Sequence, residues 1–171
     1  LEAAALDPSY RGHITNTASM AGLLTAPNMG IYNAAKAAVV SLTETLYHDL
    51  NLVTDQIGAS LLCPYFVPTG ITSSERNRQD APQAAQLTKS QIIGQAMSNK
   101  AVSSGKITAG EIAHRVFDAI SANQFYVFSH PKALGNVQSR MENIVSVTNP
   151  ADPFLARPEI GEALRAQLRA A

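Results

Sequence analysis

The chain has 171 residues, 46% of them hydrophobic, which is enough apolar side chain for one domain with its own core. Its 13 basic and 13 acidic residues balance, so it lacks the strong positive charge of a protein that binds nucleic acid or an anionic membrane. The single cysteine, Cys63, excludes an intrachain disulfide and a cysteine-cluster metal site, and no apolar run approaches the roughly 20 residues of a membrane-spanning helix. We therefore expect a cytoplasmic protein with no membrane, nucleic acid or metal partner, acting on a small molecule.

The first part of the chain predicts a strand followed by a long helix. Residues 12–19 (GHITNTAS) are a short β-prone run that ends in small residues, and a loop rich in Gly, Pro and Asn follows. From residue 31 to about residue 53, apolar side chains recur every three or four positions, which predicts a helix of about six turns with one apolar face. The predicted face consists of Ile31, Ala35, Ala38, Leu42, Leu46, Leu50 and Val53.

Two more strand patterns follow, separated by a helix pattern. Residues 57–63 (IGASLLC) form a nearly continuous apolar run closed by Pro64, which is typical of a strand buried on both faces. The capping-box pattern TAGE at residues 108–111 opens a predicted helix that extends to about residue 121. Residues 125–128 (FYVF) indicate the third strand, and another helix is predicted from about Lys132.

Two segments fall outside this alternation. Residues 71–106 are polar at first and then show a weak amphipathic pattern through Leu87, Ile92, Ile93, Ala96 and Met97. A segment of this length between a strand and a helix is either a lid that shapes a substrate pocket or a surface insertion, and the sequence favours neither. Residues 151–171 form a polar, arginine-bearing tail with room for one short helix.

The alternation of strands and helices predicts an α/β fold with an open parallel, Rossmann-like sheet, because parallel neighbouring strands need crossover helices between them. We assign residues 1–150 to this domain. Three strands make a narrow sheet, and a sheet of this kind would leave a buried-type edge without a partner.

Tyr32 and Lys36 are the first candidate catalytic pair. They are four residues apart on the predicted helix, so their side chains lie one turn apart on the same face, about 6 Å along the axis. A lysine cation near a phenol favours the phenolate, which can then exchange a proton with a substrate. Ser19 lies where the first strand gives way to a loop and could hold a carbonyl oxygen beside the phenol, or could simply cap a turn.

The segment CPYFVPTG, residues 63–70, is the second candidate. Its two prolines interrupt regular hydrogen bonding just past the second strand. Backbone groups and the Thr69 hydroxyl are therefore available to a ligand at the carboxyl edge of the sheet, although a proline-rich turn explains the segment equally well.

These motifs, in this order and spacing, resemble the catalytic half of the short-chain dehydrogenase/reductase family. The resemblance rests on TNTASMAGL, on Tyr32 thirteen residues after Ser19, on Lys36 and on PYFVPTG, and it spans about residues 12–128. It implies an oxidoreductase in which Tyr32 is the general acid/base and Ser19 positions the substrate carbonyl or hydroxyl. Lys36 would assist the ionisation of the tyrosine and bind the nicotinamide ribose.

The same resemblance implies NAD or NADP as the cofactor. The family's Pro-Gly-x-Val-x-Thr motif matches Pro64, Val67 and Thr69, in addition to the contacts of Tyr32 and Lys36 with the cofactor. Val67 would meet the nicotinamide carboxamide through its backbone, and Thr69 would bind near the carboxamide or the diphosphate. The family usually has Gly after the first Pro, and this chain has a tyrosine there, so the wall next to the nicotinamide is expected to differ in shape.

The chain contains no Thr-Gly-x-x-x-Gly-x-Gly turn and no Asn-Asn-Ala-Gly element. It therefore resembles only the second half of the family fold, and we expect it to be inactive by itself. One alternative is a catalytically silent fragment or interaction module; another is an isomerase or dehydratase built on the same Tyr/Lys pair. Because the family commonly associates through the Ala-rich helix around residues 34–38, we also expect a homodimer or homotetramer.

Overall fold

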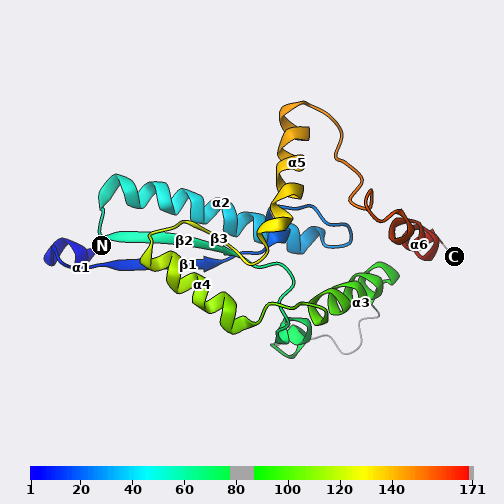
Figure 1. Ribbon diagram of the computed structural model, residues 1–171, viewed down its shortest axis with the longest axis horizontal. Coiled ribbons are helices and arrows are strands. Elements are labelled where there is room, and N and C mark those ends of the chain that lie inside the picture. Colours follow the sequence, from blue (N-terminus) through cyan, green and yellow to red (C-terminus); the bar gives the residue numbers. More distant parts are fainter. Residues whose placement is uncertain (78–86, 170–171) are drawn as a thin grey trace.

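A computed structural model describes residues 1–77 and 87–169 of the chain. Its centre is a sheet of three parallel strands in the order β1 (Gly12–Thr17), β2 (Ile57–Cys63) and β3 (Tyr126–Phe128) (Figure 1). This arrangement confirms the predicted parallel α/β sheet, and the bounds of β2 are those expected from its apolar run.

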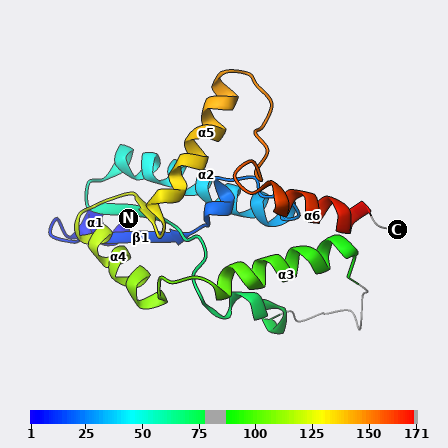
Figure 2. The ribbon, with the colours of Figure 1, turned by 45° about the vertical axis from the view of Figure 1, so that its right-hand side comes forward.

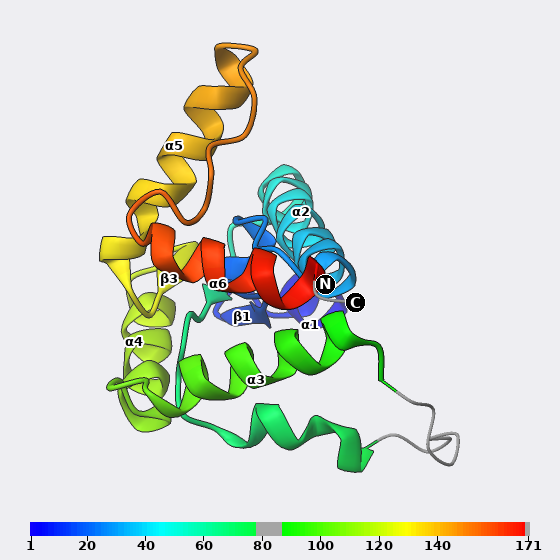
Figure 3. The ribbon, with the colours of Figure 1, turned by 90° about the vertical axis from the view of Figure 1, so that its right-hand side faces the viewer.

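The helices surround this sheet and extend past its carboxyl edge. They are α1 (Glu2–Leu6), η1 (Met20–Gly22), α2 (Gly30–Val53), η2 (Gly70–Asn77), α3 (Lys89–Ser103), α4 (Ala109–Ser121), η3 (Pro131–Ala133), α5 (Leu134–Val145) and α6 (Pro158–Arg169). Helix α2 covers one face of the sheet and α4 the other, while α3 and α6 lie beyond the carboxyl ends of the strands (Figures 1 and 3). Among the described residues, no helix is both long and apolar enough to cross a membrane.

Strand β2 is buried on both faces. Leu61 and Leu62 are neighbours in the strand and therefore point to opposite faces of the sheet. One cluster, beneath α2, consists of Ala18, Met20, Val40, Leu61 and Cys63. The other, beneath α4, consists of Leu62, Val67, Ile112, Ala119 and Val127. The fully buried Leu61 side chain contributes about 1.5–3 kcal/mol relative to an exposed one.

Helix α4 begins with the capping box that its sequence predicted. The Thr108 side chain accepts a hydrogen bond from the Glu111 backbone, and the Glu111 carboxylate accepts one from the Thr108 N–H at 2.7 Å. These bonds to Thr108 lower the pKa of Glu111. Helix α3 begins with a second capping box, formed by Thr88 and Gln91, so Leu87 lies just before the helix rather than in it.

The helix predicted here is present as α2, but its apolar face is not the face that packs on the sheet. Of the seven residues of the predicted apolar face only Leu50 is buried, and Ile31 is 91% exposed and Leu42 67% exposed. The helix packs on the sheet partly through Thr43, a fully buried polar residue. Its hydroxyl donates a hydrogen bond to the Val39 carbonyl at 2.6 Å and accepts one from Asn16 of β1 at 3.1 Å. The buried hydroxyl therefore has a partner both as donor and as acceptor. Hydrophobic periodicity cannot detect such a position.

Helix α5 projects away from the sheet (Figures 1 and 2). Leu134 and Val137 pack against the cluster beneath α2, but the other predicted apolar positions, Met141, Ile144 and Val145, are exposed. The predicted helix is therefore present, but only its first half is part of the core.

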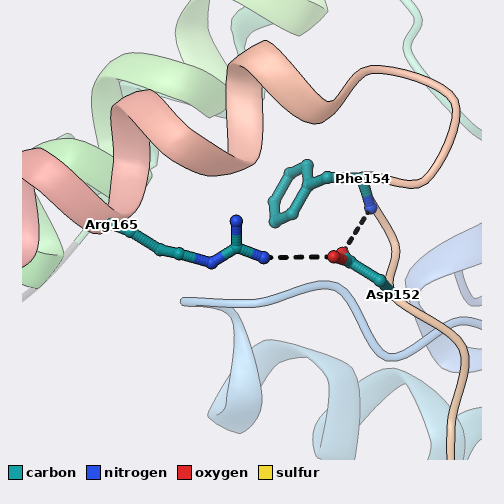
Figure 4. Close-up of polar contacts among 3 residues, drawn as sticks. All are labelled: Asp152, Phe154 and Arg165. Carbon is teal, nitrogen blue, oxygen red and sulfur yellow. Dashed lines mark hydrogen bonds and ion pairs between the residues drawn. The ribbon is translucent and has the colours of Figure 1, made fainter.

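The tail folds into α6 and is fixed by local contacts (Figure 4). Asp152 accepts a hydrogen bond from the Phe154 N–H at 2.9 Å and forms an ion pair with Arg165 at 3.1 Å. The Phe154 side chain lies against Gly161, where a Cβ would be 3.1 Å from the Phe154 Cβ and 3.2 Å from the ring. Helix α6 confirms the short helix expected in the tail.

Candidate active site

Ser19 lies at the carboxyl edge of the sheet, where β1 ends and η1 begins. Its Oγ accepts a hydrogen bond from the Ala21 N–H at 3.1 Å, so the serine does cap a turn. The same Oγ donates to the Pro64 carbonyl at 3.4 Å, and that carbonyl also accepts from the Met20 N–H at 2.9 Å. These bonds join the end of β1 to the loop after β2, so the two candidate segments of the sequence meet here.

Tyr32 and Lys36 face this edge from the first turns of α2. The Lys36 Nζ atom is 5.8 Å from the centre of the Tyr32 ring and donates a hydrogen bond to the Thr17 carbonyl, the last of β1, at 3.2 Å. Tyr32 is 39% exposed, so its phenol is open to a ligand. The helical spacing therefore brings the phenol and the ammonium group together as the sequence predicted.

Gly22 allows the Ser19 turn to approach α2 closely. A Cβ at Gly22 would lie 2.6 Å from the Lys36 carbonyl oxygen and 3.0 Å from the Ala37 nitrogen, both backbone atoms. Only a residue without a side chain fits against this turn of α2. The structure thus brings Ser19, Tyr32 and Lys36 together at one edge of the sheet, with Gly22 in the contact that holds them.

The loop between η1 and α2 is held by asparagines that the sequence analysis did not identify. Asn33 donates to the Ala26 carbonyl at 2.9 Å, and its Oδ1 is buried without a hydrogen-bond partner among the residues that the structure describes. Asn28 adopts a positive φ of 62°, and its Oδ1 accepts a hydrogen bond from Ser90 of α3 at 3.0 Å. The sequence did contain a signal for this turn. Pro27 and Asn28 form a Pro-Asn pair before Tyr32, and Asn tolerates a positive φ.

The loop after β2 presents backbone and hydroxyl groups. The Val67 side chain is buried in the cluster beneath α4, so only its peptide groups are available to a ligand. Among residues that the structure describes, those peptide groups make no backbone hydrogen bond. Thr69 is exposed, and its hydroxyl accepts a long hydrogen bond, 3.4 Å, from the Ile71 N–H.

Cys63 has a structural role. Its side chain is fully buried in the cluster beneath α2, and burial raises its pKa to about 11. The reactive thiolate is therefore suppressed. Within residues 1–77 and 87–169, no group of three or more potential metal ligands comes together.

A cavity of about 480 Å³ lies on another side of α2. It is lined by the loop before α2, by Asn33 and Ala37 of the helix, and by Arg140 of α5. Arg140 donates to the Leu23 carbonyl at 3.1 Å, so its guanidinium group holds this loop. Tyr32 and Lys36 do not line the cavity, but Ala21 and Gly22 of the Ser19 turn do, so the cavity borders the candidate catalytic edge without containing the Tyr/Lys pair.

Comparison with known proteins gives matches of one kind. A family model described as short chain dehydrogenase matches residues 3–80. The CLA biosynthesis dehydrogenase/reductase of Lactiplantibacillus plantarum is 32% identical over 137 residues, which are 78% of this chain and 48% of that protein. Human retinol dehydrogenase 10 is 36% identical over 88 residues, which are 50% of this chain and 26% of that protein.

A solved structure shares both sequence and fold. The crystal structure of a short chain dehydrogenase/reductase from Burkholderia phymatum in complex with NAD is 52% identical, with a TM-score of 0.81. The match covers 84% of this chain and 51% of that one. The chain thus spans about half the length of this protein and of the Lactiplantibacillus relative.

Proposed function

This chain belongs to the short-chain dehydrogenase/reductase family, and we propose that it carries the proton-transfer residues of an NAD(P)-dependent oxidoreductase acting on a carbonyl/alcohol pair. Because the chain spans about half the length of its relatives, the activity is proposed for the whole protein that contains it. The observation that carries the proposal is the placement of Tyr32, Lys36 and the Ser19 turn at one edge of the sheet.

Tyr32 is the proposed general acid/base. In the direction of reduction its hydroxyl gives a proton to the carbonyl oxygen, and in the direction of oxidation its phenolate takes that proton back. The Lys36 ammonium group, 5.8 Å from the ring centre, stabilises the phenolate. The nicotinamide, when bound, supplies or accepts the hydride.

Ser19 is the proposed positioning group for the substrate oxygen. Its hydroxyl donates to the Pro64 carbonyl over 3.4 Å, which is at the long limit for such a bond. That weak bond is easily exchanged for one to a substrate, while the cap to Ala21 keeps the hydroxyl oxygen in place.

The groups at this edge fit a nicotinamide nucleotide. The Lys36 ammonium and the Tyr32 hydroxyl suit ribose hydroxyls, and the free peptide groups of Val67 suit a carboxamide, which both donates and accepts. Pro64 shapes the same loop, and the exposed Thr69 hydroxyl offers a further donor. The NAD complex of the Burkholderia phymatum structure supports NAD or NADP as the cofactor.

Residues 71–106 are proposed as the substrate lid. Their described part includes α3, which contacts the loop before Tyr32 through Ser90 and Asn28. Residues 78–86 of the predicted lid lie outside the described part of the chain. A lid attached at this point would cover the edge that carries the catalytic residues.

Association of copies through α2 is also proposed. The predicted apolar face that turned out to be exposed includes Ile31, Ala35, Ala38 and Leu42, and its small residues allow close helix packing. Such a stripe supports a homodimer or homotetramer. The lone buried cysteine supports a reducing, cytoplasmic location.

A catalytically silent fragment or interaction module is the alternative, supported by the lack of a glycine-rich turn in the 171 residues. The test is to incubate the whole protein with NAD or NADP and a panel of alcohols, and with NADH or NADPH and the corresponding aldehydes and ketones, and to follow the absorbance of the reduced nicotinamide. We expect a saturable, substrate-dependent change. No redox change with any substrate contradicts the oxidoreductase, and conversion of a substrate without redox change favours an isomerase or dehydratase.

A further inference from the structure

The loop after β2 is attached to β3 by a hydrogen bond to a side chain, where the backbone hydrogen bonds of the sheet have ended. The β2–β3 ladder ends at the pair Cys63–Phe128, because Pro64, the residue after β2, has no N–H to donate. The Tyr65 N–H donates instead to the Ser129 Oγ at 2.8 Å. Ser129 is fully buried, so the backbone of Tyr65 has a fixed position relative to β3.

Further contacts reinforce this attachment. The Ser129 carbonyl accepts a hydrogen bond from the Arg115 guanidinium group of α4 at 2.6 Å, and Arg115 also donates to the Phe128 carbonyl at 3.3 Å. The Ser129 hydroxyl is 2.8 Å from the His130 Nδ1. The Arg115 guanidinium group is therefore bound to carbonyl oxygens, and the end of β3 is held from two sides.

Tyr65 belongs to an aromatic cluster, defined here as Tyr65, Phe66 and His130. The Tyr65 ring centre is 4.0 Å from that of Phe66 and 5.8 Å from that of His130, with the His130 ring in a T-shaped arrangement. Burial raises the pKa of Tyr65, so its phenol stays neutral. The Tyr65 side chain is still 38% exposed.

The aromatic cluster begins at the residue after the one that contacts Ser19. Tyr65 directly follows Pro64, whose carbonyl accepts the hydrogen bond from Ser19. A ring that is fixed through its backbone and partly open can pack against a bound molecule with little loss of conformational entropy. A flat ring also prefers a flat partner, through offset stacking or edge-to-face contact.

We propose that Tyr65 is a specificity-determining residue that favours substrates with a flat, apolar group, aromatic or conjugated, next to the carbonyl or alcohol carbon. The inference rests on the proposed function, because it takes Ser19 as the place of the substrate oxygen. It adds the substrate class, which the catalytic residues themselves do not define.

The test compares two ketones with the same carbon count, acetophenone and cyclohexyl methyl ketone, of which only the first is flat. In the whole protein, we expect the ratio of kcat/KM for acetophenone over the cyclohexyl ketone to fall about tenfold in Tyr65→Gly and in Tyr65→Leu. Tyr65→Leu keeps an apolar side chain of similar bulk and guards against a folding defect. Tyr65→Phe keeps the ring and should retain most of the preference.

Tyr10→Leu is the matched control. Tyr10 is 39% exposed and precedes β1, at the opposite end of the sheet from Tyr65. An equal change of the ratio in this variant, or an unchanged ratio in both Tyr65→Gly and Tyr65→Leu, overturns the inference.

Binding of the same two ketones, measured by NMR saturation transfer, separates the inference from the proposed function. If the whole protein shows no redox change with any substrate of the panel but binds acetophenone more tightly than Tyr65→Leu does, the proposed function fails and only the preference of Tyr65 for a flat ligand stands. If turnover occurs and neither binding nor the ratio depends on Tyr65, the proposed function stands and the role of Tyr65 fails.

Discussion

Replacing Gly22 with alanine should separate the Ser19 turn from α2. The added Cβ would lie 2.6 Å from the Lys36 carbonyl oxygen, whereas ordinary contact begins near 3.4 Å, so the two backbones must move apart by about 0.8 Å. Gly22 has no positive φ, so the effect is steric and not conformational. Overpacking of this kind costs about 1–3 kcal/mol. In a protein of this size that lowers Tm by about 2–4 °C for each kcal/mol.

The catalytic rate should fall together with the stability. Ser19 and Lys36 lie on the two sides of this contact, and a misplacement of about 1 Å between reacting groups can reduce the rate about 100-fold. We would measure urea unfolding and kcat of the Gly22→Ala variant in the whole protein. Gly135→Ala is the control, because a Cβ at this position in α5 meets no atom within 4 Å. If Gly22→Ala behaves like Gly135→Ala in both assays, the packing described here does not position Ser19.

Two further predictions concern stability. Burial lowers the pKa of His13, whose Nε2 is 2.7 Å from the Ser60 Oγ, so the unfolded chain binds more protons than the native one below the ordinary value of 6.5. The free energy of unfolding should therefore decrease as the pH falls through 6.5, and His13→Gln, but not the control His48→Gln, should flatten this slope in urea titrations at several pH values. Val147 is 91% exposed with a φ of 53°, a conformation that costs a β-branched residue about 1–2 kcal/mol. Val147→Gly should therefore raise the urea midpoint, whereas Val145→Gly, within α5, should lower it; a lower midpoint for Val147→Gly contradicts this reading.

The secondary structure could be predicted closely because it depends on local signals. The apolar run of β2 ends at a proline, and α4 begins at a capping box, so the bounds of both elements follow from adjacent residues. The buried face of α2 could not be predicted in the same way. Thr43 is buried because Asn16, far away in the sequence, supplies a hydrogen bond, and no pattern within the helix encodes that partner.

The candidate site also combines a local contact that the sequence predicts with a long-range contact that it does not. The spacing of Tyr32 and Lys36 on one helix determines their proximity, so the sequence alone was sufficient for this pair. The attachment of Tyr65 to Ser129 joins residues that are 64 positions apart, and the end of the β2–β3 ladder determines which atoms meet. Such a contact depends on the strand register, which single-sequence patterns do not provide.

The central claim is that Tyr32 exchanges the proton of a carbonyl/alcohol substrate. The most direct measurement is turnover of the whole protein with Tyr32→Phe, beside Tyr10→Phe as the control and with cofactor affinity measured for both. Loss of a general acid/base reduces the rate by about 100- to 10,000-fold, and we expect this loss in Tyr32→Phe with cofactor affinity largely retained. Turnover of Tyr32→Phe equal to that of Tyr10→Phe would contradict the assignment.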